Sequence, residues 1–413
     1  MTDLPTAACA RHIVYALSDT LDLVGIDDIA HGKRVGIMAA ECARHLGWPE
    51  QRIARVFDLG LLHDIGVSST ATHRQLVSEF DWSSSQQHCQ IGYRLLREYP
   101  PLADLAEPVL YHHTHWPALP AGLPRATAEA ANLIYLVDRV DALAAPFHAA
   151  GTLLRHTASI REQICAHAAA CFAPDLLAAF LAASRSEAFW LTLEPRGIRV
   201  YLGSMLPATA AEPVPASELK PLARILSRIV DAKSPFTAEH SQGVAALARL
   251  LAEQCGVTGA NLDKIEIAGL LHDIGKLRVP DEILDKPGQL DHDERQVMNA
   301  HSFETWQILR QIPGCEEIAP WAAYHHEEPG GHGYPFHLDA NTLPLEARIL
   351  RVADIFQAMT QNRPYRRGLD LAAAAAFMRE LVAAGRLDGE LVERLLDIPL
   401  AALAAAQPTL QPG

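Results

Sequence analysis

The chain has few cysteines and a shortage of positive charge, and each shortage argues against a class of protein. Its 413 residues include seven cysteines, an odd number, and no two of them form a Cys-x-x-Cys pair. This pattern argues against a disulfide framework and predicts reduced thiols in a cytoplasmic protein. The formal net charge is −14, which argues against binding to a nucleic-acid polymer, because such binding needs a broad basic face. A small anionic substrate stays compatible, since it needs only a local cluster of cations.

Long hydrophobic runs are also absent. The apolar stretch at 371–377 is rich in alanine and is soon broken by Arg379 and Glu380, well short of the roughly 20 residues that span a bilayer. The sequence does not open with a basic segment, an apolar core and a cleavage site, so we expect neither export nor a membrane anchor. With 49% hydrophobic and 20% charged residues, the composition is typical of a soluble globular protein of two or three domains.

Periodicity predicts an all-α fold. Apolar residues recur at three-to-four spacing over 34–45, 247–254 and 371–381, as expected of amphipathic helices. One exception lies at 189–202, where two β-like runs flank Pro195-Arg196-Gly197. We expect a small β-hairpin there, near the end of the first domain.

A change in composition marks a domain boundary. Residues 203–216 are rich in Ala, Pro, Ser and Thr and lack periodicity, which is typical of a linker. We predict a first domain at 1–203, a linker at 204–216, a second domain at 217–406 and a flexible tail at 407–413.

Histidine and aspartate residues form the same ladder twice. The first copy consists of His31, His63, Asp64, His88, His112, His113 and Asp138, and the second of His240, His272, Asp273, His301, His325, His326 and Asp354. In both copies the first histidine precedes the His-Asp pair by 32 residues, and the third histidine precedes the His-His pair by 24. A random scatter of 20 histidines would not reproduce these spacings. We therefore predict two related helical domains built around clustered metal ligands.

The adjacent ligand pairs suit a metal site. His272 and Asp273 follow an apolar helical run at 265–271, and adjacent residues on a helix point about 100° apart. The pair can therefore approach a metal from two directions, with the carboxylate able to bridge two ions. Imidazoles and carboxylates without thiolates favour iron, manganese or another borderline transition metal, and the identity of the metal stays open.

Three segments around the second copy carry a family resemblance. Residues 269–280 read GLLHDIGKLRVP, residues 325–335 read HHEEPGGHGYP, and residues 353–366 read ADIFQAMTQNRPYR. Together they resemble the HD-GYP domain, the bacterial cyclic-dinucleotide phosphodiesterase branch of the HD metal-dependent phosphohydrolases. The first domain resembles the more divergent HD domain that precedes HD-GYP in a tandem subgroup of these enzymes.

The resemblance implies a two-metal site in the second domain. One metal would be held by His240, His272, Asp273 and Asp354, and the other by His301, His325 and His326, with Asp273 bridging the two. A hydroxide between the metals would be the nucleophile, because two cations lower the pKa of a shared water and neutralise phosphoryl oxygens.

The resemblance also implies a substrate site. Lys276 would reach the scissile phosphate, and Arg363 and Arg366, three residues apart, would clamp phosphate oxygens if they share a helical turn. Gly333, Tyr334 and Pro335 together form a rigid turn that would shape the lip of the pocket or a partner surface.

The function that follows is hydrolysis of cyclic di-GMP to linear pGpG, and onward to GMP, by a cytoplasmic enzyme. Two alternatives stay open. The first is a phosphodiesterase for 3′,3′-cyclic GMP-AMP, since no residue separates guanine from adenine. The second is a non-catalytic signalling protein that binds a cyclic dinucleotide, or a diguanylate cyclase (GGDEF) partner through the Gly-Tyr-Pro turn. A homodimer is compatible with all three.

Several residues depart from the family pattern. Phe236 replaces a glutamate that binds a third metal in some relatives, so we predict two metals. Gln357 and Gly330 replace acidic residues, and these changes could alter the position of Lys276 and loosen the Gly-Tyr-Pro turn. Glu327, after the His pair, could orient a ligand, assist proton transfer or form a salt bridge.

The first domain lacks most of the substrate equipment. Val67 stands at the position of Lys276, Thr114 stands at that of Glu327, and the Gly-Tyr-Pro turn is missing. Metal binding by the first copy stays open. We expect this domain to sense, regulate or dimerise rather than to catalyse the reaction.

Overall fold

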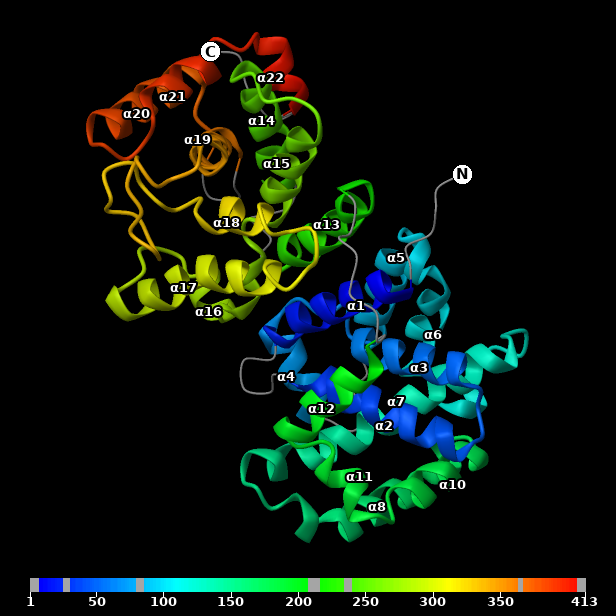
Figure 1. Ribbon diagram of the computed structural model, residues 1–413. Coiled ribbons are helices and arrows are strands. Elements are labelled where there is room, and N and C mark those ends of the chain that lie inside the picture. The colour runs from blue at the N-terminus through cyan, green and yellow to red at the C-terminus, as the bar shows by residue number, and fades with distance from the viewer. Residues whose placement is uncertain are drawn as a thin grey trace. The chain divides into compact units, whose positions relative to one another are not determined.

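The computed structural model is helical in both halves of the chain (Figure 1). It describes residues 7–24, 30–78, 85–206, 216–233, 240–362 and 367–406. Within these residues there is no β-sheet, and the one β feature is an isolated bridge between Gly330 and Asp339. The all-α prediction is confirmed. The chain divides into two compact units, Met1–Glu212 and Pro213–Gly413.

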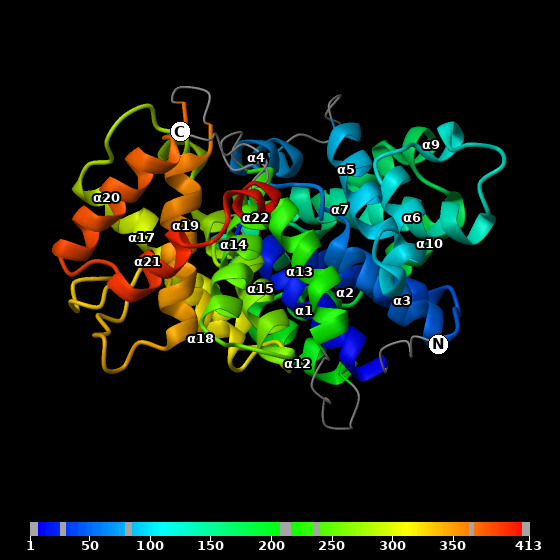
Figure 2. The same cartoon turned by 90° about the horizontal axis from the view of Figure 1, so that it is seen from above.

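In the first unit, helix α2 occupies the centre. Residues 34–40 of α2 are all buried, so the helix is enclosed on every side, and it packs against α3, α7 and α10. Figures 1 and 2 show α2 and α3 side by side. The helices of the unit are α1 (Ala7–Asp22), α2 (His31–His45), α3 (Glu50–Leu62), α4 (Thr70–Ser78), α5 (Gln86–Arg97), η1 (Pro100–Leu105), α6 (Ala106–Tyr111), η2 (Trp116–Ala118), α7 (Arg125–Ala149), η3 (Leu153–Arg155), α8 (Thr157–Ala166), α9 (Ala168–Cys171), α10 (Pro174–Ala183), α11 (Glu187–Leu191) and α12 (Pro195–Met205).

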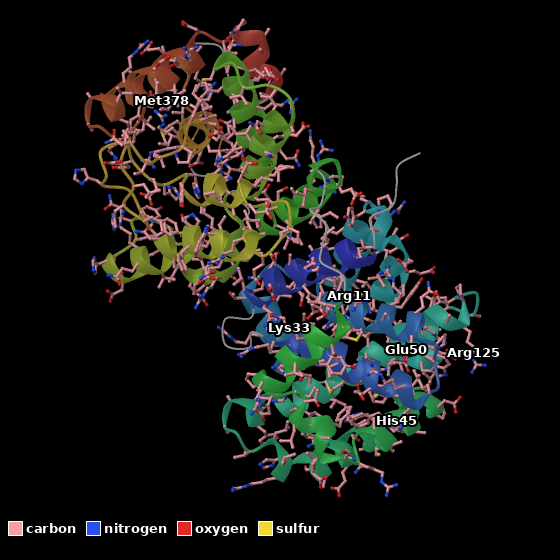
Figure 3. All side chains as sticks on the ribbon, viewed as in Figure 1. Arg11, Lys33, His45, Glu50, Arg125 and Met378 are labelled. Carbon is pink, nitrogen blue, oxygen red and sulfur yellow. The ribbon has the colours of Figure 1, made fainter. Side chains whose placement is uncertain are left out.

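In the second unit, α14 has the place that α2 has in the first. It packs against α15 and α19, and α17 contacts η4 and α18. Met378 of α20 is fully buried, whereas Glu50 and Arg125 of the first unit are exposed (Figure 3). The helices are α13 (Ala216–Asp231), α14 (His240–Gln254), α15 (Ala260–Leu271), η4 (Ile274–Arg278), α16 (Asp281–Leu284), α17 (His292–Leu309), α18 (Ile318–Ala323), α19 (Leu345–Thr360), α20 (Leu371–Ala383), α21 (Gly389–Leu396) and α22 (Leu400–Ala406).

Both units place their ligand-type residues on corresponding elements. The lone histidine begins α2 or α14, the His-Asp pair directly follows α3 or α15, and the third histidine lies in α5 or α17. The His-His pair comes just after α6 or α18, and the last aspartate lies in α7 or α19. The repeated spacings therefore correspond to a repeated helical scaffold.

The predicted β-hairpin at 189–202 is wrong, because α11 and α12 occupy this segment. Pro195 takes the first position of α12, where its missing N–H costs nothing and its fixed φ favours a helix. The hydroxyl of Tyr201 donates to Glu41 of α2 at 2.8 Å, and Ile198 is buried. These contacts with the rest of the unit override the local β propensity.

The predicted linker and tail fall largely outside the described residues. Helix α12 ends at Met205 and α13 begins at Ala216. Residues 207–215 and 407–413, like Phe236, Arg363 and Arg366, are not among those the structure describes.

Candidate metal centres

The structure brings the seven ligand-type residues of the second copy together. The two oxygens of Asp273 face different groups of histidines. Oδ2 lies 3.3 Å from Nε2 of His272 and 3.9 Å from Nε2 of His240, whereas Oδ1 lies 3.5 Å from Nε2 of His301 and 3.7 Å from Nε2 of His325. A carboxylate in this position is able to bridge two ions.

The remaining two residues complete the two groups. Oδ1 of Asp354 lies 3.2 Å from Nε2 of His240 and 3.9 Å from Nε2 of His272. The ring of His326 joins His301 and His325, and the donor atoms of these three histidines lie within 4.8 Å of one another. The donor atoms of His272, His325 and Asp354 also lie within 4.8 Å of one another, so the two groups adjoin, and the assignment of each ligand to one ion stays a prediction.

Hydrogen bonds to the backbone orient three of the rings. Nδ1 of each ring lies 2.6 to 2.7 Å from the carbonyl oxygen three residues earlier, in the pairs His272 and Gly269, His301 and Met298, and His325 and Ala322. Because a carbonyl only accepts, Nδ1 carries a hydrogen in each ring, and Nε2 is the nitrogen that faces the carboxylates of the cluster. Metal-binding histidines are usually held in this way.

The charge states of the groups also suit a metal. Burial lowers the pKa of His301 to about 4, and burial together with the neighbouring imidazoles holds the pKa values of His325 and His326 well below the usual range. Although burial opposes it, the charges of His272 and Lys276 hold the pKa of Asp273 well below its usual value. Neutral imidazoles and ionised carboxylates are the forms that coordinate metals. His272 differs, because the charge of Asp273 outweighs burial and raises the pKa of this ring to about 9, so it has to lose a proton to bind an ion.

Three buried polar atoms of this cluster lack a hydrogen-bond partner within the described residues, and one of them is Nδ1 of His240. Within the described part of the chain, neither Oδ1 of Asp273 nor Nε2 of His272 makes a hydrogen bond. Leaving such groups unsatisfied is costly, and a metal ion on each side of Asp273 would satisfy both. The donor set therefore fits a pair of borderline transition metals.

The backbone approaches closely where η4 passes α17. A Cβ atom on Gly275 would lie 2.0 Å from the carbonyl oxygen of His301, and one on Gly66 would lie 2.0 Å from that of His88. Glycine is therefore required two residues after each His-Asp pair. The close backbone contact at this glycine sets the position of the aspartate relative to the third histidine in both units.

Lys276 lies at the edge of the cluster. Its Nζ atom donates to Oδ2 of Asp273 at 2.6 Å, and its side chain is 21% exposed. The amine therefore contacts Asp273 and is also accessible to solvent.

The Gly-Tyr-Pro turn also borders the cluster. The rings of Tyr334 and His326 stack with their centroids 4.8 Å apart and their planes at 24°. Gly333 passes so close to Glu327 that a Cβ would lie 2.4 Å from the Cα of Glu327. The turn therefore packs against a candidate ligand.

Glu327 has a role that the sequence analysis did not identify. Its fully buried carboxylate accepts hydrogen bonds from the backbone amides of Phe336, at 2.7 Å, and Leu338, at 2.9 Å. It thus anchors the segment that follows the Gly-Tyr-Pro turn. In the sequence, the position of Glu327 directly after the His pair was the one feature that pointed to a role for it.

Gln357 and Gly330, the two positions at which the family pattern has acidic residues, lie in different surroundings. Gln357 is buried against Gly243, one turn from Asp354. The amide of Gly330 donates to the carbonyl of Gly385 at 3.0 Å, so this end of the turn has a backbone anchor.

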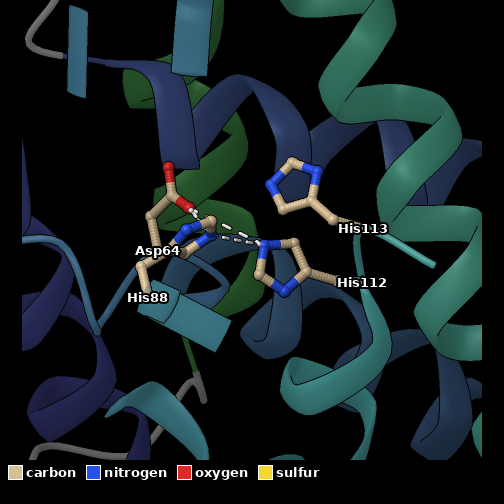
Figure 4. Close-up of side chains that lie close together, drawn as sticks. All are labelled: Asp64, His88, His112 and His113. Carbon is tan, nitrogen blue, oxygen red and sulfur yellow. Dashed lines mark hydrogen bonds and ion pairs between the residues drawn. The ribbon is translucent and has the colours of Figure 1, made fainter. Parts of the chain in front are cut away.

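The first copy forms a cluster of the same shape. Oδ1 of Asp64 lies 3.2 Å from Nε2 of His88 and 3.7 Å from Nε2 of His112 (Figure 4). Oδ2 of Asp64 lies 3.5 Å from Nε2 of His63. His31, His113 and Asp138 complete this cluster, with Nε2 of His31 3.3 Å from Oδ1 of Asp138 and Nε2 of His113 3.9 Å from its Oδ2.

The fold and the two clusters define a tandem HD-domain protein, and family models agree. An HD-domain model matches residues 28–145, and a second HD-domain model matches residues 224–391. No helix in the described segments is long and apolar enough to cross a bilayer.

Comparison with known proteins extends over both units. The chain is 37% identical over 392 residues to 3′3′-cGAMP-specific phosphodiesterase 1 of Vibrio cholerae serotype O1, covering 93% of this chain and 90% of that protein. It is 37% identical over 155 residues to the cyclic di-GMP phosphodiesterase response regulator RpfG of Xanthomonas campestris pv. campestris, covering 37% of this chain and 41% of that protein. The crystal structure of a cyclic GMP-AMP specific phosphodiesterase of V. cholerae matches with a TM-score of 0.63 at 26% identity, over 97% of this chain and 98% of that one. The chain belongs to the tandem-HD group of the HD-GYP cyclic-dinucleotide phosphodiesterase family.

Proposed function

We propose that the second unit is a metal-dependent phosphodiesterase that opens a cyclic dinucleotide. The observation that carries this proposal is the position of Asp273, whose two oxygens face two separate sets of buried histidines. One divalent ion would be held by His240, His272, Asp273 and Asp354, and the other by His301, His325, His326 and Asp273. When bound, two such ions lower the pKa of a shared water and neutralise the oxygens of the phosphoryl group. Iron and manganese suit this donor set best.

The protein's own groups supply orientation and charge. Lys276 is the cation nearest to Asp273, and a small rotation would bring its ammonium to a phosphate oxygen beside the cluster. There it would donate a hydrogen bond to charge that develops in the transition state. Arg363 and Arg366, which lie outside the described residues, stay as predicted phosphate ligands.

The Gly-Tyr-Pro turn would form one wall of the substrate site. Tyr334 covers one face of the His326 ring, and Glu327 fixes the segment after the turn. This arrangement would exclude water from the side of the cluster next to His326, where an ordered wall improves the orientation of the diester.

The comparison favours 3′,3′-cGAMP as the substrate to test first. The relative that aligns over both units is named for this dinucleotide, whereas RpfG, named for cyclic di-GMP, aligns over 37% of the chain. Cyclic di-GMP, which the sequence predicts, is the second candidate. A diguanylate cyclase partner at the Gly-Tyr-Pro turn, a homodimer and a cytoplasmic location stay as predictions.

An assay with both dinucleotides tests the proposal. The chain is loaded with manganese or, without oxygen, with ferrous iron, and linear product is followed by chromatography. We expect cleavage of 3′,3′-cGAMP and slower cleavage of cyclic di-GMP. If neither dinucleotide is opened at full metal occupancy, the protein is not a phosphodiesterase, and the non-catalytic alternative is favoured.

A further inference from the structure

We propose that the first unit holds a second pair of divalent transition-metal ions, in a closed centre that stabilises this unit and does not act on a dinucleotide. The ligands would be His31, His63, Asp64, His88, His112, His113 and Asp138. This inference goes beyond the proposed function, which uses the second unit alone.

The first argument is the geometry of the bridging carboxylate. Asp64 divides its oxygens between two sets of histidines as Asp273 does, with Oδ1 3.2 Å from Nε2 of His88 and Oδ2 3.5 Å from Nε2 of His63. The corresponding distances in the second unit are 3.5 Å and 3.3 Å. Oδ1 of Asp64 is buried and makes no hydrogen bond within the described residues.

The second argument is the orientation of the rings. Nδ1 of His63 lies 2.8 Å from the carbonyl oxygen of Gly60, and Nδ1 of His112 lies 2.7 Å from that of Val109. Both rings therefore turn Nε2 towards Asp64 (Figure 4 shows His112). The second unit uses the same backbone contacts for its ligands.

The third argument is a carboxylate behind the first histidine that the second unit lacks. Nδ1 of His31 donates to Oδ2 of Asp141 at 2.8 Å, and Arg34 balances the charge of Asp141 through bonds of 2.6 and 2.8 Å. Such carboxylate-histidine pairs raise the basicity of a metal-binding ring. Arg139 donates to Oδ2 of Asp138 at 2.8 Å and fixes the orientation of this carboxylate.

In the second unit the carboxylate that accepts from Nδ1 of the first histidine is missing. Gln357 and Gly243 take the places of Asp141 and Arg34. Within the described part of the chain, Nδ1 of His240 has no hydrogen-bond partner. We therefore expect the first unit to hold its metal at least as tightly as the second.

The surroundings of the first cluster do not suit hydrolysis. Val67, which is buried, stands where Lys276 stands in the second unit. The cavity beside His31, His63 and Asp64 has a volume of about 20 Å³, which holds about one water molecule. Without a lysine beside the cluster and without a Gly-Tyr-Pro turn, the first unit lacks the groups proposed to orient a diester, so bound ions would act on the stability of the unit by joining the five helical regions that supply the ligands.

Metal analysis of the full chain tests this proposal independently of any hydrolysis. The double variant D273A/H325A dismantles the second cluster, and we expect it to retain two manganese ions per chain by elemental analysis after gel filtration. Adding D64A should remove them. The proposal is overturned if the folded double variant retains no ion, or if its ions survive the D64A change.

A milder variant covers the case in which these changes prevent folding. D141N keeps every proposed ligand but weakens the support of His31, so we expect manganese affinity of the first centre to fall about 10- to 100-fold. Its matched control is D175N, at an exposed position of α10. In the wild-type chain, manganese should also raise the melting temperature of the first unit. Equal manganese affinity in D141N and D175N, or saturation of the wild-type chain at two ions, overturns the proposal.

Discussion

The ammonium group of Lys276 donates a hydrogen bond of 2.6 Å to Oδ2 of Asp273, the oxygen that faces His240 and His272. The same amine is partly exposed to solvent, so under the proposed function it would be able to turn towards a phosphate if metal ions held the carboxylate. The contact explains why a lysine three residues after the aspartate belongs with the cluster.

Replacing Lys276 by methionine should separate metal binding from hydrolysis. The variant loses one hydrogen-bond donor to the transition state, which typically costs about 10²- to 10³-fold in kcat. The metal content should be unchanged or higher, because a competing cation is gone. The control is K286M, which removes a partly exposed lysine paired with Glu294. An unchanged kcat, or a loss of metal in step with the loss of rate, would contradict the role given to Lys276.

Replacing Glu327 by glutamine should loosen the segment after the Gly-Tyr-Pro turn. The amide group of glutamine offers one acceptor instead of two, so one of the two backbone amides of Phe336 and Leu338 loses its partner. A buried donor without a partner costs about 1–3 kcal/mol. We expect a lower melting temperature and a raised KM, whereas E390Q, which alters an exposed pair with Arg394, should behave like the wild type. Identical thermal melts for E327Q and the wild type would refute the anchoring role.

Gly333 should not tolerate a side chain. An alanine Cβ would lie 2.4 Å from the Cα of Glu327, so the turn would have to move and its contact with His326 would change. We expect G333A to lose hydrolysis while it keeps its metals. G203A is a suitable control because a Cβ there meets nothing within 4 Å. Full activity of G333A would show that the turn does not shape the site.

Metal binding to the second unit should weaken as the pH falls. Burial lowers the pKa of His272, but the charge of Asp273 overrides this effect and raises it to about 9. The metal-free ring therefore carries a proton below about pH 9, which a metal must displace. Because binding must displace this one proton, the apparent affinity for manganese should fall about tenfold for each unit by which the pH falls. Manganese titration of the D64A variant at several pH values between about 6 and 8 measures the slope, and an affinity independent of pH would contradict it.

Much of the site could be predicted because its residues are of rare types at repeated spacings. The ladder of His31, His63 and Asp64 and its second copy indicated which side chains would meet, since the repeated spacings correspond to the same series of helices in both units. The helices at 34–45, 247–254 and 371–381 were also correctly predicted, because apolar periodicity is a local signal.

The parts that could not be predicted depend on contacts between distant residues. The pair of His31 and Asp141 joins positions 110 residues apart, and Glu327 anchors backbone that no pattern marks. The segment at 189–202 was wrongly assigned to strands because Tyr201 bonds to Glu41 across the unit, a contact that local propensity does not reflect.

The most direct test of the central claim is the rate at which linear product forms from 3′,3′-cGAMP and from cyclic di-GMP in the wild-type chain and in D273N. Both proteins are measured at saturating manganese, with metal content determined on the same samples. We expect the wild type to open at least one of the two dinucleotides, and we expect the rate of D273N, which lacks an ionised carboxylate between the two proposed ions, to fall to background. Product formed by D273N at the wild-type rate, or no product from the fully loaded wild type, would contradict it.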